Sequence, residues 1–221
     1  MTPAARIAAV IELLSDGPQN VPAGQVLRRG LQKRRYAGSG DRAAISALFW
    51  TVHRTLARLG WHLQQHGYAP TPRALVLAAL ALVDQLPAGD IAALFGGDSK
   101  HAAEALDEEE IALVAAFEGQ TLDISSMPRD VLLEWPVGLL ADVDAALGDA
   151  ADAELAAMRR EAATDLRINP LKVKDRRVVR DKLAGRGIKC HPTPLSPLGI
   201  RLVRRTRTED LAEFRSGLFD I

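Results

Sequence analysis

Apolar residues recur at helical spacing through most of the first 160 residues. The first helix is marked by apolar positions at i, i+3, i+4 and i+7, namely Ile7, Val10, Ile11 and Leu14. Asp41 is a favourable N-cap for a long amphipathic helix that runs to about Leu59. Similar patterns predict further helices at 22–36, 87–95, 107–117, 136–147 and 151–162.

One segment of this region has no polar face. Thr71-Pro72 supplies an N-cap and a first helical residue, and the segment 75–86 behind it is apolar around the whole helix. Such a helix must be enclosed by others. Because nothing before residue 164 alternates as a strand does, the pattern predicts an all-α bundle around this buried central helix.

The pattern changes after Thr164. A short β-prone run around Leu166 and Ile168 is followed by a basic helix that Asp175 caps and that ends near 185–187. Two more extended runs follow at 188–191 and 199–203. The predicted fold class is therefore mainly α, with a helical bundle at 1–150 followed by a small α+β domain at 151–221.

The charge distribution adds a functional indication. The chain has 28 basic and 28 acidic side chains, but residues 1–80, 81–160 and 161–221 carry net charges of +7, −13 and +6. Basic surfaces at both ends suit a polyanion. The longest apolar stretch, 74–83, is far shorter than the ~20 residues of a membrane span. We therefore expect no membrane association and a cytoplasmic location.

Two basic blocks account for this indication. No acidic residue lies between Asp16 and Asp41 to neutralise the first block at i±4. Lys and Arg release counterions when they meet phosphates, so the first block predicts contact with RNA or DNA. The first block consists of Arg28, Arg29, Lys33, Arg34, Arg35 and Arg42, which Arg54 extends. The second consists of Arg167, Lys172, Lys174, Arg176, Arg177, Arg180 and Lys182.

Other candidate chemistry is weak. His62 and His66 lie at i, i+4 without a third metal ligand, and we expect both on the surface near a helix C-terminus. Gly38-Ser39-Gly40 lacks the lysine of a phosphate loop and reads as a flexible connector. The single cysteine, Cys190, excludes an internal disulfide framework and a cysteine-rich metal site. We predict no metal and no cofactor in this chain.

Several motifs resemble a known family. Val26-Leu27, Asp41-Arg42, the run 48–52 and Arg54 resemble the NusB-like RNA-binding domain. The run 165–172, Asp-Leu-Arg-Ile-Asn-Pro-Leu-Lys, resembles the LRxNxLK signature of RNA cytosine-5 methyltransferases of the RsmB/Fmu (NOL/NOP/Sun) family. The runs 191–202 and 214–221 also fit the second small domain of that family. The resemblance covers the whole chain, but only as the front half of such an enzyme.

The resemblance implies a catalytic domain that this chain lacks. Family members bind S-adenosylmethionine in a Rossmann-like domain and use cysteines for catalysis. This chain has no glycine-rich methyl-donor loop, and Cys190 follows Lys189 rather than a proline or threonine. We therefore expect a truncated region, inactive alone, that docks onto the missing catalytic domain, and we expect Cys190 to be a packed strand residue.

Two functions remain open from the sequence. In the first, the chain binds substrate RNA, specifically ribosomal RNA, for the methyltransferase, and the small domain contributes Arg167, Asn169, Lys172, Lys174, Arg176 and Arg177. The alternative is a NusB-like antitermination or protein-interaction module that docks a basic partner through its acidic middle third. The sequence names neither the RNA, nor the modified nucleotide, nor the oligomeric state.

Overall fold

The structure is a computed structural model that describes residues 1–16, 21–97, 101–204, 206 and 208–221. The chain forms two compact units, Met1–Arg159 and Arg160–Ile221. The first is helical and the second holds a small sheet, so the fold is mainly α with a small α+β part, as predicted. The sequence placed the domain boundary near residue 150, whereas the helix Ala151–Met158 lies in the first unit.

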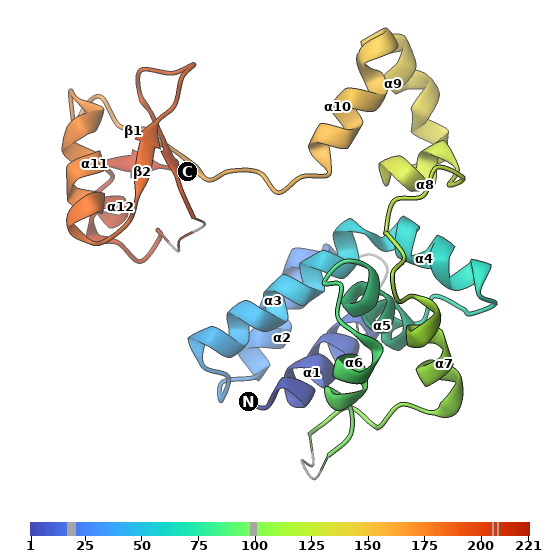
Figure 1. The fold of residues 1–221 in the computed structure, drawn as a ribbon. Coiled ribbons are helices and arrows are strands. Elements are labelled where there is room, and N and C mark those ends of the chain that lie inside the picture. The colour runs from blue at the N-terminus through green and yellow to red at the C-terminus, as the bar shows by residue number, and fades with distance from the viewer. Residues whose placement is uncertain (17–20, 98–100, 205, 207) are drawn as a thin grey trace. The chain divides into compact units, whose positions relative to one another are not determined.

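Helices make up the regular structure of the first unit (Figure 1). They are α1 (Pro3–Ser15), α2 (Ala23–Lys33), α3 (Ser39–Arg54), α4 (Leu56–Gln65), α5 (Pro72–Leu82), α6 (Ala88–Ala93), α7 (Glu108–Ala116), α8 (Arg129–Leu133), the 3-10 turns η1 (Val137–Leu139) and η2 (Gly148–Ala150), α9 (Leu140–Leu147) and α10 (Ala151–Met158). The single long helix expected from Asp41 to Leu59 is divided at Thr55 into α3 and α4. The short helix α8 was not predicted.

Helix caps explain several of these boundaries. The Thr71 hydroxyl accepts a hydrogen bond from the Ala74 amide at 3.2 Å, as its position before Pro72 predicted. Asp41 is not the N-cap that the sequence suggested. The N-cap of α3 is Gly38, three residues earlier, and the Asp41 carboxylate accepts from the Gly38 amide at 3.1 Å. Gly38-Ser39-Gly40 is thus a helix start rather than a flexible connector.

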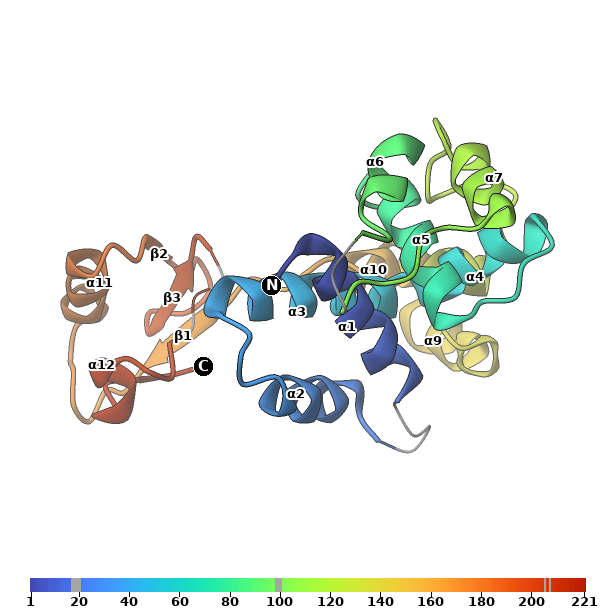
Figure 2. The same ribbon diagram turned by 90° about the horizontal axis from the view of Figure 1, so that it is seen from below.

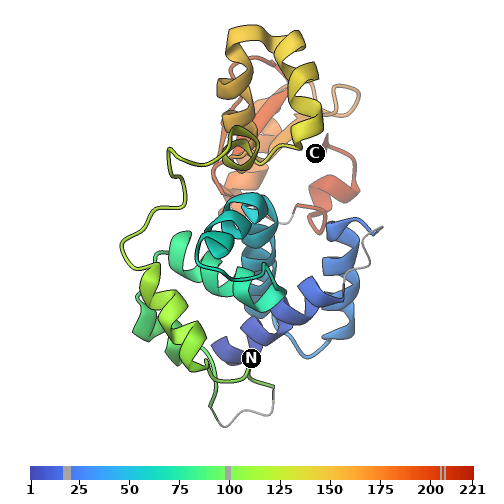
Figure 3. The same cartoon turned by 90° about the vertical axis from the view of Figure 1, so that its right-hand side faces the viewer.

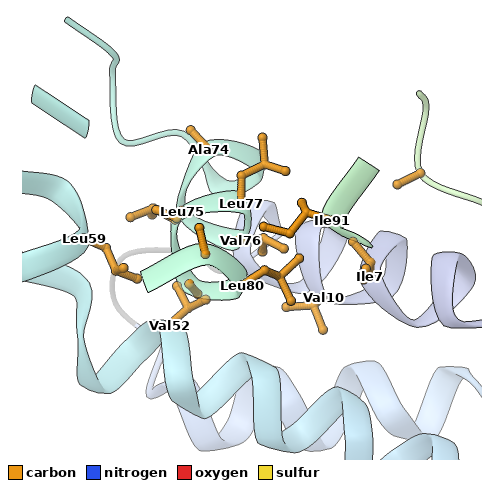
Figure 4. Packing of buried hydrophobic residues seen from close by; sticks show 14 of the residues in the cluster. Ile7, Val10, Val52, Leu59, Ala74, Leu75, Val76, Leu77, Leu80 and Ile91 are labelled. Atoms are coloured by element: carbon orange, nitrogen blue, oxygen red, sulfur yellow. The ribbon is translucent and has the colours of Figure 1, made fainter. Parts of the chain in front are cut away.

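Helix α5 is the buried centre of the first unit, as its sequence predicted. Each of its residues from Ala74 to Leu82 is buried. Figure 4 shows α5 side chains among apolar residues of neighbouring helices, including Ile7, Val10, Val52, Leu59 and Ile91. Burying a Leu or Val side chain, as α5 does at Val76 and Leu77, stabilises the fold by about 1.5–3 kcal/mol, so α5 contributes strongly to the stability of the first unit.

Helices α8 to α10 follow the bundle, with α9 and α10 forming a helical hairpin (Figure 3). A buried ion pair holds α8 to α4. The Glu134 carboxylate accepts from the backbone amides of Ala57 and Arg58 at 2.9 and 3.0 Å, and from Arg58 Nε at 2.9 Å. Glu134 therefore caps α4 from a distant part of the chain while neutralising the Arg58 guanidinium.

The second unit contains a four-stranded sheet in the order β2-β3-β1-β4, with antiparallel pairings throughout. Its elements are β1 (Asp165–Ile168), α11 (Arg176–Gly185), β2 (Cys190–Pro192), β3 (Gly199–Leu202), α12 (Ala212–Arg215) and β4 (Phe219–Asp220). The sequence predicted β1, α11, β2 and β3 in this order. It missed α12 and β4: four residues are little more than one helical turn, which shows no helical periodicity, and two residues show no alternation.

Alternation along β1 separates two faces of this sheet. Leu166 and Ile168 are buried with Val179 and Leu183 of α11, whereas Arg167 is exposed. Figure 1 shows α11 beside the sheet. The elements described here include no helix that is both long and apolar enough to cross a membrane.

Candidate nucleic-acid interface

Helix α2 lies at the periphery of the first unit (Figure 2) and is rich in basic residues. Leu27 and Gly30 form its buried side. Four cationic side chains are exposed along the rest of the helix and just beyond its end: Arg28, Arg29, Lys33 and Arg35. None of the four makes a side-chain hydrogen bond or ion pair within the part of the chain that the structure describes. These four residues, called the α2 cations below, are therefore positioned to meet an external anion.

Arg34 and Arg42 have internal roles instead. The Arg34 guanidinium donates to the Gly30 carbonyl at 3.1 Å and pairs with Glu12. Arg42 donates to the carbonyls of Leu31, Arg34 and Ala37 at 3.0, 3.1 and 2.9 Å. These carbonyls lie at and just beyond the end of α2, where no amide of the helix is left to donate to them. Arg42 thus holds the α2–α3 connection together, whereas Arg34 ties the end of α2 to α1, and the predicted RNA contact of both gains no support from the structure.

Two other residues border the α2 cations. Arg54, the last residue of α3, is exposed but has an interaction partner within the chain, so it does not belong to the unpaired set. Tyr36 is 70% exposed directly after Arg35. It is the one exposed aromatic ring that the sequence places beside this block, so a base-stacking platform is not apparent here.

In the second unit, Asn169 and Lys172 are also occupied internally. Asn169 Nδ2 donates to the Gly217 carbonyl at 3.1 Å, and its Oδ1 accepts from the Leu171 amide at 3.1 Å. Lys172 Nζ donates to the Ser216 carbonyl at 2.6 Å. The Asn and Lys of the 165–172 motif thus fasten the loop after β1 to the segment after α12. This gives them a structural role, and the predicted RNA contacts of both gain no support.

A basic cleft of about 550 Å³ opens between the start of α11 and the loop that joins β2 to β3. Its lining combines four cations, one carboxylate and three apolar residues: Lys174, Arg176, Arg177, Arg180, Asp175, Pro192, Pro197 and Ile200. Asp175 is occupied as the helix cap, since its carboxylate accepts from the Arg177 amide at 2.8 Å. The cleft therefore has a clear excess of positive charge.

Arg167 lies elsewhere on the second unit. It is exposed on β1 and lines a separate hollow of about 410 Å³ with Phe214, Phe219 and Asp220, among others. This hollow is lined by one cation and one acid, Arg167 and Asp220, whereas the cleft beside α11 is lined by four cations and one acid. It is thus less suited to an anion than the cleft beside α11.

The histidines and the cysteine do not form a reactive site. His62 is 1% exposed, and its Nε2 lies 3.0 Å from the Leu122 carbonyl oxygen, so the surface position expected for it was wrong. Burial lowers the pKa of His62. His66 is exposed as expected. Within the described ranges, no three His, Cys, Asp or Glu side chains are grouped as a metal would require.

Many acidic side chains of the middle third have internal partners. Glu110 forms an ion pair with Arg73 at 2.6 Å. Arg129 binds both Asp144 and Asp152, at 2.5 and 2.6 Å. Part of the negative charge that the sequence assigned to a docking surface is therefore neutralised within the fold.

The chain is similar to known proteins in part of its sequence and in its fold. Residues 135–209 match the family model of the ferredoxin-like domain of RsmF/RsmB-like methyltransferases. The chain is similar over its whole length to the solved structure of PH0851, with a TM-score of 0.56 and 16% identity. It covers 53% of that protein, and thus spans about half the length of its structural relative. No curated protein matches the chain.

The matched residues, about a third of the chain, contain α9, α10 and most of the sheet unit. The likeness to PH0851 concerns the fold, and it extends to the helical unit. Together the two findings support an RsmB/Fmu-like N-terminal region, the family that the sequence motifs resembled.

Proposed function

We propose that this chain is the RNA-binding, NusB-like N-terminal region of an S-adenosylmethionine-dependent ribosomal RNA (cytosine-5) methyltransferase. In this role it works in the cytoplasm and positions substrate RNA for a catalytic domain that is outside this chain. The observation that carries the proposal is the set of α2 cations, which are exposed and unpaired within the described residues.

The arrangement of the α2 cations suits contact with an RNA backbone. Arg28 and Lys33 are five residues apart on one helix, a separation of about 7.5 Å along its axis. Cations spread over this length can contact more than one phosphate and release the associated counterions. With Tyr36 as the neighbouring exposed ring, the surface favours recognition of backbone and shape over reading of base edges.

The residues that the structure describes offer no candidate site for methyl transfer itself. Cys190 lies in β2 and is half-buried, and burial raises the pKa of its thiol. A catalytic thiol needs the opposite shift, because the thiolate is the nucleophile. The glycines of the described residues likewise form no strand-to-helix loop for a nucleotide cofactor. The described residues therefore do not fit S-adenosylmethionine.

The docking of a basic partner by the acidic middle third is the weaker alternative. Glu110, Asp144 and Asp152 have internal arginine partners, which reduces the charge that a partner could use. Glu108, Glu109 and Asp142 are exposed and form no ion pair within the described residues, so part of this negative charge remains, whereas all four α2 cations are unpaired. An RNA ligand is therefore better supported than a basic protein.

Fluorescence anisotropy of the full chain with structured ribosomal RNA fragments tests the proposal. We expect saturable binding that weakens as salt rises. The double variant R28E/R29E should reduce the affinity at least about tenfold, because each reversal replaces attraction to a phosphate by repulsion.

The matched control is K189E/R204E, which makes the same change in net charge at exposed positions of the second unit, outside the proposed contacts. It should bind RNA within about threefold of the wild type. Salt-independent binding, or equal losses in the two variants, would show that the α2 cations do not form an RNA contact.

A further inference from the structure

The basic cleft between α11 and the β2–β3 loop has a feature beyond its net charge. Arg176 holds the wall of the cleft through one nitrogen only. Its Nη1 donates to the carbonyls of Thr193, Ser196 and Gly199 at 3.3, 2.8 and 3.2 Å. These bonds fix the β2–β3 loop and the guanidinium relative to each other.

The other edge of this guanidinium is unused. Arg176 Nε and Nη2 make no hydrogen bond within the residues that the structure describes. These two N–H groups point in parallel from one side of the planar group, and such a fork binds two oxygens of a phosphate or carboxylate at once. Because Nη1 is anchored, the fork is already oriented, and less conformational entropy is lost on binding.

The neighbouring cations favour phosphate over carboxylate. Lys174 and Arg177 are exposed and have no side-chain partner in the described ranges, and both line the cleft beside Arg176. Arg180 contributes a further cation, although it is paired with Asp181 at 2.8 Å. A carboxylate has two oxygens and one charge, whereas several converging cations match the larger number of oxygens on a phosphate group.

The size of the cleft indicates that the phosphate is part of a larger molecule. Its volume of about 550 Å³ lies within the range of pockets that hold small organic ligands. Pro192 and Pro197 are exposed and supply apolar walls against which a sugar or base can pack.

We propose that this cleft binds the phosphate of a nucleotide unit, with Arg176 as the bidentate anchor and Lys174 and Arg177 as supporting cations. The assignment of that nucleotide to an RNA chain rests on the function proposed above. A free nucleotide presents the same phosphate chemistry, and the test below separates the two sources.

The test uses the ¹⁵N-labelled full chain and amide NMR spectra. The probes are inorganic phosphate, cytidine monophosphate and a short single-stranded RNA. The variant K174Q/R177Q removes the supporting cations and leaves Arg176 to hold the loop, and K189Q/R204Q is its control. Spectra of each variant without ligand establish that the second unit is folded.

We expect saturable shifts of amides near Arg176 and Gly199 with every probe, weakened at least about fivefold in K174Q/R177Q and unchanged in the control. The slope of log K for RNA binding against log salt concentration should become shallower by about 1 for each phosphate contact removed. Shifts that are absent or unsaturable with all three probes would overturn the proposal.

The outcomes also separate this proposal from the proposed function. If the chain binds RNA through the α2 cations but K174Q/R177Q binds RNA as the wild type does, the RNA assignment of the cleft is refuted and the proposed function stands. If the chain binds no RNA while cytidine monophosphate still shifts the cleft amides, the proposed function fails and the phosphate site stands with a free nucleotide as its ligand.

Discussion

Arg42 provides the sharpest test of how the basic block divides between folding and binding. The sequence grouped Arg42 with the RNA-contacting residues, whereas in the structure its guanidinium spans three backbone carbonyls at the end of α2. Substitution of Arg42 by lysine keeps the charge but removes the planar group that reaches all three. The R42K variant therefore separates a need for charge from a need for this geometry.

The cost follows from the bonds that are lost. The shorter ammonium side chain of R42K would retain at most one of the bonds, and a hydrogen bond to a charged group contributes about 1.5–3 kcal/mol. Arg42 is half-buried, and the Arg34 carbonyl keeps a second partner in the Ala37 amide at 3.0 Å, so water and this bond offset part of the loss. We expect the R42K variant to lower the free energy of unfolding of the first unit by about 1–3 kcal/mol.

Tryptophan fluorescence during urea unfolding measures this quantity selectively. The three tryptophans, Trp50, Trp61 and Trp135, all lie in the first unit, so the signal excludes the sheet unit. The control is R28K, the same substitution at an exposed position of α2, which should change the stability by less than about 0.5 kcal/mol. Below its unfolding transition, R42K should bind RNA as the wild type does. Unchanged stability combined with weaker RNA binding would refute this account of Arg42.

Three further outcomes follow from the structure. Substitution E134Q removes the charge that caps α4 and neutralises buried Arg58. Because Asp123 still pairs with Arg58 at 2.6 Å, the loss should be about 1–3 kcal/mol in the same fluorescence assay, and a loss below about 0.5 kcal/mol would contradict this role. Substitution G199A would place a Cβ 1.9 Å from the Thr193 hydroxyl oxygen. It should therefore destabilise the second unit by about 1–3 kcal/mol in NMR-monitored unfolding. Unchanged stability would show that Thr193 does not restrict residue 199 to glycine. Hydrogen bonds from the amino terminus and from Arg6 hold the pKa of Asp41 below its ordinary value of 3.8. The ionised carboxylate therefore stabilises the folded chain above pH 3.8, and this stabilisation is lost as the pH falls through the lower pKa of the folded state. The D41N variant should lose that part of the acid dependence, and an unchanged pH profile of stability would exclude it.

Much of the fold could be predicted because it depends on local pattern. The buried helix α5 follows from an apolar segment behind Thr71-Pro72, and the sheet unit from short β-prone runs around the basic helix α11. The break at Thr55 has no proline or glycine to signal it. The burial of His62 depends on Leu122, which is sixty residues away along the chain. Contacts of that kind leave no mark in a local sequence pattern.

The candidate site could be predicted as a set of charges but not as individual contacts. Composition and spacing identified the basic blocks around Arg28 and Arg177. They could not show that Arg42, Asn169 and Lys172 bind backbone carbonyls, because those partners are brought together by tertiary structure. The cleft was missed for the same reason, since its second wall comes from the β2–β3 loop.

The salt dependence of RNA affinity tests the central claim most directly. For the wild type and the R28Q/R29Q variant, log K for a structured ribosomal RNA fragment is measured against log salt concentration at a fixed temperature. Loss of two phosphate contacts should make the slope shallower by about 1.8 for a duplex ligand, with R42K remaining at the wild-type slope. A slope that is the same in the wild type and R28Q/R29Q would contradict an RNA interface on α2.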